Sequence, residues 1–406
     1  MEAEIESIES GTVTSPQGFH AGATAAGIKE SAGDRLDLGV LFSQEPCVTA
    51  GLLTSNSIKS APVLLCQERL REGHRAMAVV ANSGCANAST GDRGLADAAE
   101  MASLAANSIG TESETVLVAS TGVIGRLLPM ERIKDGLNNI SLSDDGGHEL
   151  AMAIMTTDTF PKEDALTVRD GDTRYTIGGV AKGSGMIHPN MATLLCFLTT
   201  DAAVDPSFLE MALRRAASVS FNMVSIDGDT SPSDTLLLMA NGMAGNAPLL
   251  ERTRSAEVFQ EALDRVCIHL AKSIARDGEG ATKLIEITVN GAVNQADAVT
   301  AARTIVSSPL LKSAVYGCDP NWGRVVAALG RSGAKVEEAT LDVYIGDTMV
   351  LKAGTPQPFN EAGVVQILEQ SEVTITVNLN LGPASATAWG CDLTEEYVLI
   401  NSKYTT

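Results

Sequence analysis

Short apolar runs alternate with amphipathic stretches along the chain, and this alternation predicts an α/β protein. Residues 77–82 (MAVVAN) and 115–120 (TVLVAS) are continuous apolar runs that end in small polar residues. Such runs are typical of buried strands that present loops at their carboxyl ends. Residues 283–292 (KLIEITVNGA) alternate between apolar and polar side chains, which predicts a further strand. Residues 341–351 predict a β-hairpin that turns at Gly346-Asp347.

Two segments carry the periodicity and the end signals of helices. In residues 255–276 apolar side chains recur at helical spacing, Ser255 is a candidate cap at the start, and Gly278 lies just beyond the end. A second helix is expected to begin at Asp205-Pro206, because an aspartate cap followed by proline suits a first turn. No internal repeat or composition break marks a domain boundary.

The composition restricts the classes of function. A net charge of −21 over 406 residues argues against partners such as nucleic acid or anionic membrane surfaces. The first ten residues are acidic and lack the features of a targeting peptide, and no apolar run is long enough to span a bilayer, so we expect a cytoplasmic protein. The seven cysteines are widely spaced and include no CxxC pair, which predicts reduced thiols and no metal site.

Five segments combine glycine with small and polar residues more densely than folding requires. Each could be an ordinary turn between a strand and a helix, but α/β proteins also place ligands at such turns. Within them Ser184 lacks the GxSxG setting of a nucleophile, Cys85 has no evident histidine partner, and His188 is expected to be structural. The five segments are residues 81–94, 119–125, 155–162, 181–193 and 276–283.

Thr193, at the end of one of these segments, fits a nucleophile that is made by self-cleavage. A threonine hydroxyl needs a base, and the residue's own α-amine, with a pKa of about 7.7–8.0, can serve as one. An internal threonine gains this amine only when its hydroxyl attacks the Ala192 carbonyl and the resulting ester is hydrolysed. The small Ala192 and the preceding glycine-rich turn suit that reaction, and residues 120–122 (STG) are candidate donors to the oxyanion.

Several long motifs, in the same order along the chain, resemble those of one enzyme family. They are GFHAGATAAGIKES (18–31), ASTGVIG (119–125), KGSGMIHPNMATLL (182–195), DGEGATK (277–283), DPNWGR (319–324) and INSKYTT (400–406). The family is that of ornithine acetyltransferase / glutamate N-acetyltransferase in arginine biosynthesis, and the similarity runs nearly from end to end.

The resemblance implies a precursor that cuts itself between Ala192 and Thr193 into an α chain (1–192) and a β chain (193–406). Thr193 would accept the acetyl group of N-acetylornithine and release ornithine. Glutamate would then take the acetyl group and leave as N-acetylglutamate. No cofactor is implied, and acetyl-CoA is left open as a further acetyl donor, because members with and without that activity share these motifs.

The resemblance also assigns roles to individual residues. Thr121 and Gly122 match the oxyanion hole, and the substrate-binding threonine matches Thr156, although its neighbour Thr157 is an alternative. Cys85 and the pair Ser402-Lys403 depart from the usual family residues and touch none of these assignments. The substrate-binding residues that the resemblance implies are Thr156, Lys182, Thr193, Glu279, Asn401 and Thr406.

The implied fold is α/β, with two β-sheets sandwiched between helix layers and a smaller α/β lobe. It resembles N-terminal-nucleophile hydrolases but differs from them in connectivity. The usual assembly would be a heterotetramer of two α and two β chains. Two alternatives remain at this point: an N-terminal-nucleophile amidase or aminopeptidase, in which water takes the acyl group, and a non-catalytic relative that binds an amino acid.

Overall fold

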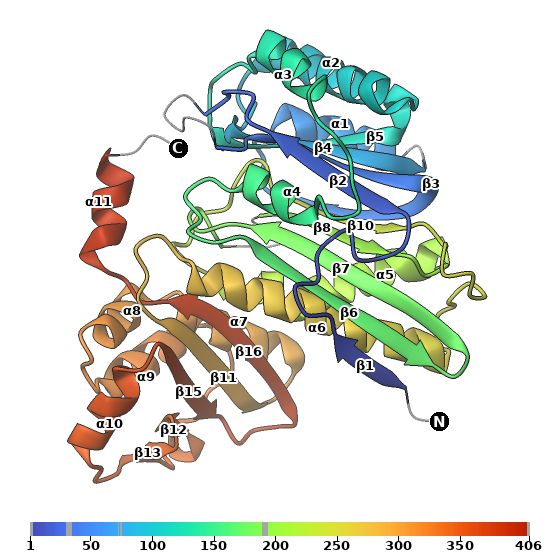
Figure 1. Ribbon diagram of the computed structural model, residues 1–406. Helices are drawn as coiled ribbons and strands as arrows, with labels where there is room; N and C mark the ends of the chain where they lie inside the picture. The colour runs from blue at the N-terminus through green and yellow to red at the C-terminus, as the bar shows by residue number, and fades with distance from the viewer. Residues whose placement is uncertain (1–2, 30–34, 72, 74, 189–193, 404–406) are drawn as a thin grey trace.

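Two mixed β-sheets and the helices that cover them form the protein (Figure 1). The computed structural model describes residues 3–29, 35–71, 73, 75–188 and 194–403. The α/β class and the two sheets that the sequence led us to expect are therefore confirmed.

The larger sheet comprises, among the described residues, nine strands. Their order is β1-β6-β7-β8-β10-β3-β4-β5, and β2 pairs with β3 as well. The strands are β1 (Glu4–Ser7), β2 (Phe19–Thr24), β3 (Leu38–Leu53), β4 (Ala76–Cys85), β5 (Val116–Val123), β6 (Lys162–Asp170), β7 (Thr173–Lys182), β8 (Leu195–Thr200) and β10 (Thr235–Ala240).

The long strand β3 joins the two halves of this sheet. Its first part pairs with β2 and β4, whereas residues 48–53 pair with β10. Side chains from both halves share one apolar core; Val40 of β3 and Phe197 of β8 are examples. The parallel pair β4 and β5 and the adjacent pair β7 and β8 are thereby held at fixed positions around the loops at their ends.

The second sheet forms the smaller lobe with helices α7 to α10, in the lower left of Figure 1. The hairpin expected at Gly346-Asp347 is confirmed, because β12 and β13 pair antiparallel across that turn. The strands, in spatial order, are β14 (Thr355–Pro356), β13 (Thr348–Lys352), β12 (Asp342–Ile345), β15 (Glu372–Asn378), β11 (Leu284–Ala292), β16 (Ala384–Cys391) and β9 (Val224–Ser225).

Helices cover both sheets, and the long helix α6 packs against strands of each of them. Helices α1 to α3 cover the upper end of the larger sheet in Figure 1, and α11 stands at the side, near the carboxyl terminus. The helices are α1 (Ala61–Arg71), α2 (Gly91–Ile109), α3 (Met130–Leu137), α4 (Gly147–Ile154), α5 (Pro206–Val219), α6 (Arg254–Arg276), α7 (Gln295–Val306), α8 (Pro309–Tyr316), α9 (Trp322–Gly330), α10 (Glu361–Leu368) and α11 (Glu395–Lys403).

The two expected helix starts have different outcomes. The Asp205 side chain accepts hydrogen bonds from the N–H groups of Ser207 and Phe208, which confirms the predicted cap of α5. The prediction that Ser255 caps α6 was wrong. Thr253 occupies the cap position and accepts from the N–H of Ala256, while the Ser255 hydroxyl donates to Asp170.

Two features concern a possible membrane span and the state of the cysteines. Among the described residues, none of the helices combines the length and the apolar character that a membrane span requires. All seven cysteines are free thiols, and only Cys318 is more than marginally exposed.

Candidate active site

A cavity of about 150 Å³ lies where the five glycine-rich segments meet. Each segment contributes at least one residue to its lining, namely Ala86, Thr121, Thr156, Lys182 and Glu279. These residues lie at or just beyond the ends of β4, β5 and β7 and in the loops that follow α4 and α6. Segments that are far apart in the sequence therefore line one small space, and four of them contribute polar side chains to it.

Thr121 and Gly122 form one wall of the cavity, near the end of β5. Gly122 lies opposite Gly84 of the parallel strand β4, and its φ angle is +125°, which favours glycine. A Cβ atom at Gly122 would lie only 2.4 Å from the carbonyl carbon of Gly84. Glycine is therefore required here, and the wall beside the Thr121 hydroxyl consists of bare backbone.

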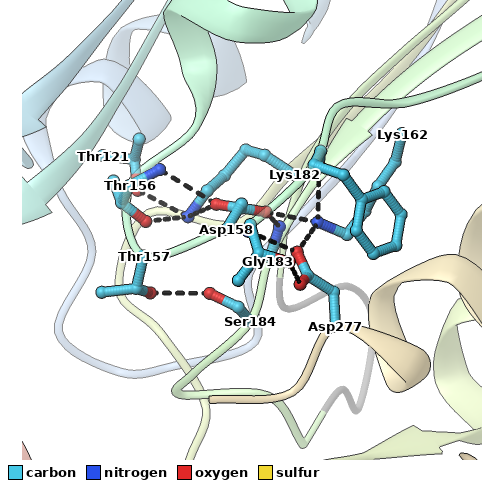
Figure 2. Close-up of polar contacts among 11 residues, drawn as sticks. Thr121, Thr156, Thr157, Asp158, Lys162, Lys182, Gly183, Ser184 and Asp277 are labelled. Atoms are coloured by element: carbon cyan, nitrogen blue, oxygen red, sulfur yellow. Dashed lines mark hydrogen bonds and ion pairs between the residues drawn. The ribbon is translucent and has the colours of Figure 1, made fainter. Parts of the chain in front are cut away.

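Lys182, the last residue of β7, brings a cation into this cavity. Its Nζ donates to Oγ1 of Thr156 at 2.8 Å and to Oγ1 of Thr121 at 3.4 Å (Figure 2). The side chain is only 9% exposed, and this burial lowers the pKa of Lys182, while the nearby charge of Asp158 partly offsets the effect. One ammonium group is thus held between two hydroxyl groups at the cavity wall.

A buried network of ion pairs, formed by Asp158, Lys162 and Asp277, lies next to Lys182 (Figure 2). Asp158 accepts from Lys162 Nζ at 2.7 Å and from the Gly183 N–H at 2.7 Å, and it lies 3.9 Å from Lys182 Nζ. Lys162 also donates to Asp277 at 2.6 Å. Burial disfavours the Asp158 carboxylate, but Lys182 and Lys162 outweigh this and hold its pKa well below the usual range.

Glu279 adds a carboxylate to the cavity lining, and the lack of a side chain at Gly185 leaves room for it. A Cβ atom at Gly185 would lie 2.6 Å from both carboxylate oxygens of Glu279. The Glu279 carboxylate accepts from Asn401 Nδ2 at 2.7 Å, which ties helix α11 to the site. Asn401, near the chain end, therefore lies in the cavity lining together with Lys182 and Glu279.

Thr156 and Thr157 both line the cavity but bond differently. Thr156 accepts from Lys182, whereas Oγ1 of Thr157 and Oγ of Ser184 share a hydrogen bond of 2.6 Å. Ser184 is fully buried, as expected for a structural serine. The geometry therefore favours Thr156 as the threonine associated with the cation.

Three residues of the sequence-based assignment, Ala192, Thr193 and Thr406, lie outside the described residues. The chain on each side of the first two does line the cavity, through Ile187 before them and Leu194 directly after Thr193. The cleavage site that the sequence predicts thus belongs to a segment whose described flanks both reach the cavity.

Sequence reasoning missed the acidic loop after β9. Asp227, Asp229 and Asp234 line the cavity, so that with Glu279 its described lining contains four carboxylates and one ammonium group, that of Lys182. Asp227 also accepts from the N–H groups of Met186 and Ile187, at 2.6 and 2.9 Å. The signal in the sequence was DGDTSPSD (227–234), a turn-rich acidic segment between two apolar runs. This excess of acid suits a ligand that carries ammonium groups.

Cys85 and His188 have structural surroundings. Burial raises the pKa of the Cys85 thiol, and its Sγ contacts the Arg126 carbonyl at 3.3 Å. His188 shares hydrogen bonds with Ser225 at 2.9 Å and Arg303 at 3.2 Å. Among the described residues, no three histidine, cysteine or carboxylate side chains are grouped as metal ligands would be.

Comparison with known proteins gives a consistent result over the whole chain. The model of the ArgJ family matches residues 20–406. The arginine biosynthesis bifunctional protein ArgJ of Dehalococcoides mccartyi (strain CBDB1) is 51% identical over 406 residues, which cover 100% of both chains.

Two solved structures are also similar. Arginine biosynthesis bifunctional protein ArgJ from Bacillus halodurans is 45% identical with a TM-score of 0.50, covering 51% of this chain and 97% of that one. Ornithine acetyltransferase from Mycobacterium tuberculosis, complexed with ornithine, is 40% identical with a TM-score of 0.43, covering 47% of this chain and 100% of that one.

Proposed function

The chain belongs to the ArgJ family, and from this we propose that it transfers the acetyl group of N2-acetylornithine to glutamate after cutting itself between Ala192 and Thr193. It is an acetyltransferase of arginine biosynthesis. The observation that carries the proposal is the convergence of Thr121, Gly122, Lys182 and Glu279 on one cavity. An acyl transfer needs hydrogen-bond donors to the oxyanion and groups that orient an amino-acid substrate, and these residues are of the required types.

Self-cleavage has support from the lengths of related polypeptides. The Bacillus halodurans chain aligns over 97% of its length with only 51% of this chain, so it is about half as long. A precursor cut before Thr193 gives one chain of residues 1–192 and one of residues 193–406, each close to that length. The two chains would remain together, because strands β7 and β8 pair across the cut and share one core.

In the proposed reaction Thr193 Oγ1 attacks the acetyl carbonyl carbon of the substrate. The free α-amine of Thr193 takes the hydroxyl proton and then delivers it to the departing amino group of ornithine. The Thr121 hydroxyl and the backbone N–H of Gly122 stabilise the oxyanion that forms in between. Glutamate then attacks the acetyl-Thr193 ester through its own amine, with the same groups acting in reverse.

Charge complementarity supports the assignment of the binding residues. The Lys182 ammonium suits the substrate carboxylate. Glu279, together with Asn401 and Thr406, suits an ammonium group of the substrate. The aspartates that line the cavity after β9 suit the second ammonium group, which ornithine carries once the acetyl group has left. Thr156 completes the set of proposed substrate-binding residues, and its hydroxyl also accepts a hydrogen bond from Lys182.

The experiment that tests this function supplies acetyl-labelled N-acetylornithine with and without glutamate. We expect labelled N-acetylglutamate only when glutamate is present, with little free acetate. Equal acetate release without glutamate would instead identify an amidase. An uncut chain that binds the amino acid and forms no acetyl-enzyme would identify a binding protein.

Three further parts of the proposal follow from the family. Relatives that are named bifunctional support acetyl-CoA as a second acetyl donor for glutamate. Two copies of the cut unit would assemble into a heterotetramer of two α and two β chains. We propose that the enzyme acts in the cytoplasm.

A further inference from the structure

The turn before β10 contains a buried hydroxyl group that the proposed mechanism does not use. Ser233 lines the active-site cavity and is only 5% exposed. Its Oγ atom is buried and has, within the described part of the chain, no hydrogen-bond partner. A buried hydroxyl without a partner is unfavourable, so its presence calls for an explanation. A partner that forms only after the chain has been cut would provide one.

The backbone on both sides of this hydroxyl is fixed by hydrogen bonds. The Ser233 N–H donates to the Ser231 hydroxyl at 3.2 Å, and the Ser233 carbonyl accepts from the Thr235 hydroxyl at 3.1 Å. Thr54 donates from its hydroxyl to the Ser231 carbonyl at 2.7 Å and from its N–H to the Asp234 carbonyl at 3.0 Å. The Ser233 hydroxyl is therefore held at a fixed position at the cavity wall.

Ser233 lies beside the point at which the β chain would begin. Strands β8 and β10 are parallel, and the Thr235 N–H donates to the Leu194 carbonyl at 2.8 Å. The residues directly before Thr235 therefore lie next to Leu194, which also lines the cavity. Thr193 is bonded to Leu194, and the geometry of one peptide unit keeps its α-nitrogen within about 5 Å of the Leu194 Cα atom. The amine that cleavage would free thus arises in the part of the cavity that Ser233 lines.

We propose that Ser233 is a positioning residue, whose Oγ atom accepts a hydrogen bond from the α-amine of Thr193 once the chain has been cut. The inference rests on the proposed function, in which this amine is the base. For proton transfer the lone pair of the amine must point at Thr193 Oγ1, so its N–H groups have to be bonded elsewhere. A hydroxyl at a fixed position can bond one of them and so select that orientation. The proton moves from Thr193 Oγ1 to the amine, and no covalent bond to Ser233 forms or breaks.

A neutral hydroxyl suits this role better than the neighbouring carboxylate of Asp234. That residue is only 2% exposed and lies at the same wall. A carboxylate bonded to the amine would strongly favour the protonated form and so weaken the amine as a base, whereas a hydroxyl favours that form only weakly. Ser233 can therefore orient the amine while leaving it able to accept a proton.

The same hydroxyl is not expected to act in self-cleavage. Before the cut, the nitrogen of Thr193 belongs to a peptide bond, and resonance with the carbonyl group removes its basic lone pair. Ser233 then has no amine to orient. Self-cleavage and acetyl transfer should for this reason respond differently to the loss of the hydroxyl.

The test measures the two reactions separately in Ser233→Ala. We expect the rate of self-cleavage, followed by the loss of the uncut chain, to stay within about twofold of the wild type. In the cut enzyme the kcat for transfer from N-acetylornithine to glutamate should fall about tenfold, because the base is less well oriented. The KM for each substrate should stay within about twofold, since both halves of the reaction use the same base. Ser233→Cys, whose thiol is a weak acceptor, should have an intermediate kcat.

The pH dependence separates orientation of the base from a structural effect. A hydrogen bond from the protonated amine to Ser233 favours that form, so the pKa of the amine should fall when the hydroxyl is removed. The acid limb of kcat/KM for N-acetylornithine should therefore move to lower pH by about half a unit in Ser233→Ala. A structural defect would lower the rate at every pH and leave the limb in place. The charged side chains of the described cavity lining, which are the same in both enzymes, are Lys182, Asp227, Asp229, Asp234 and Glu279.

Ser60→Ala is the matched control. Ser60 is fully buried, and its Oγ atom also has no hydrogen-bond partner among the residues that the structure describes. Its N–H donates to the Pro232 carbonyl at 3.0 Å, so it contacts the same turn, but it lies outside the described lining of the cavity. Self-cleavage, kcat and the pH profile of this variant should match those of the wild type.

Three results would overturn the proposal. The first is a cut Ser233→Ala enzyme with the kcat and pH profile of the wild type. The second is a variant whose main defect is slow self-cleavage, with normal transfer once it has been cut. The third is a lower kcat with an unmoved acid limb, which would identify a structural effect. A wild type that is never cut, or that transfers no acetyl group, counts instead against the proposed function itself.

Discussion

Lys182 contacts hydroxyl groups of the cavity wall on one side and a buried carboxylate on the other. On the cavity side it donates to Thr156 and Thr121, and on the buried side it faces Asp158. Its charged state is therefore maintained by a carboxylate that the substrate does not touch. This arrangement leaves the ammonium free to meet a substrate carboxylate without losing its internal counter-charge.

The lowered pKa of Lys182 predicts a pH dependence of substrate binding. A lysine whose pKa is depressed loses its proton below the ordinary value of 10.5, so the KM for N-acetylornithine should rise as the pH increases toward that value. In Lys182→Arg the cation persists at all accessible pH values, so the alkaline rise should be smaller. The substrate's own amine titrates equally in both enzymes. A KM profile that is the same in both enzymes would contradict this role.

Asp158 should be more important for stability than an ordinary ion pair. Asp158→Asn leaves Lys162 and Lys182 buried with less counter-charge, and we expect the free energy of unfolding to fall by about 3 kcal/mol. Glu163→Gln is the matched control, because Glu163 pairs with the largely exposed His148, and its loss should be within about 1 kcal/mol. Urea denaturation of the cut enzymes measures both. An equal decrease in the free energy of unfolding in the two variants would show that the ion pairs of Asp158 with Lys162 and Lys182 do not stabilise the fold.

At the scale of elements, helix starts show what local sequence can and cannot predict. Asp205-Pro206 was recognised because the cap and its bonded N–H groups are adjacent in the sequence. The cap of α6 was assigned to Ser255, whereas Thr253 fills the position and Ser255 bonds to Asp170 on another strand. Two hydroxyl residues so close together compete for one cap, and a contact distant in sequence decided between them.

The cap of α6 can be tested with its matched alternative. Thr253→Ala should lower the free energy of unfolding by about 1 kcal/mol, because the Ala256 N–H loses its acceptor. Ser255→Ala should have a smaller effect, since only its hydrogen bond to Asp170 is lost. Thermal denaturation ranks the two, and a larger effect at Ser255 would reverse the assignment.

Helix α11 acts on the site without contributing to the core. None of its side chains is buried, yet Asn401 donates to Glu279. Removing residues 395–406 should therefore leave self-cleavage and the melting temperature nearly unchanged and raise the KM for N-acetylornithine about tenfold. Ser402→Ala, a change at an exposed position of the same helix, should have no effect. A truncated enzyme with normal KM would exclude the helix from substrate binding.

At the scale of the whole molecule, the sequence predicted which segments carry the chemistry but not how their charges are arranged. Glycine-rich turns at strand ends identified the segments of Thr121, Lys182 and Glu279, and the family resemblance assigned their roles. Asp158 and Asp227 were missed, because their bonds to Lys162 and to the 186–187 backbone exist only in the folded chain.

The proposed mechanism depends on Thr193 becoming a chain terminus. Before the cut, the Thr193 hydroxyl lacks the α-amine that activates it. The oxyanion donors and the substrate-binding residues of the cavity then have no activated nucleophile beside them. Both steps of the proposed transfer, from N-acetylornithine and to glutamate, pass through the acetyl-Thr193 ester.

The most direct test is the intact mass and amino-terminal sequence of the purified protein beside a Thr193→Ala variant. We expect two fragments from the wild type, the second beginning Thr-Leu-Leu-Cys, and a single inactive chain of 42.3 kDa from the variant. Thr193→Ser, which retains a hydroxyl, should still be cut. A wild-type enzyme that transfers acetyl groups as one uncut chain would contradict the mechanism.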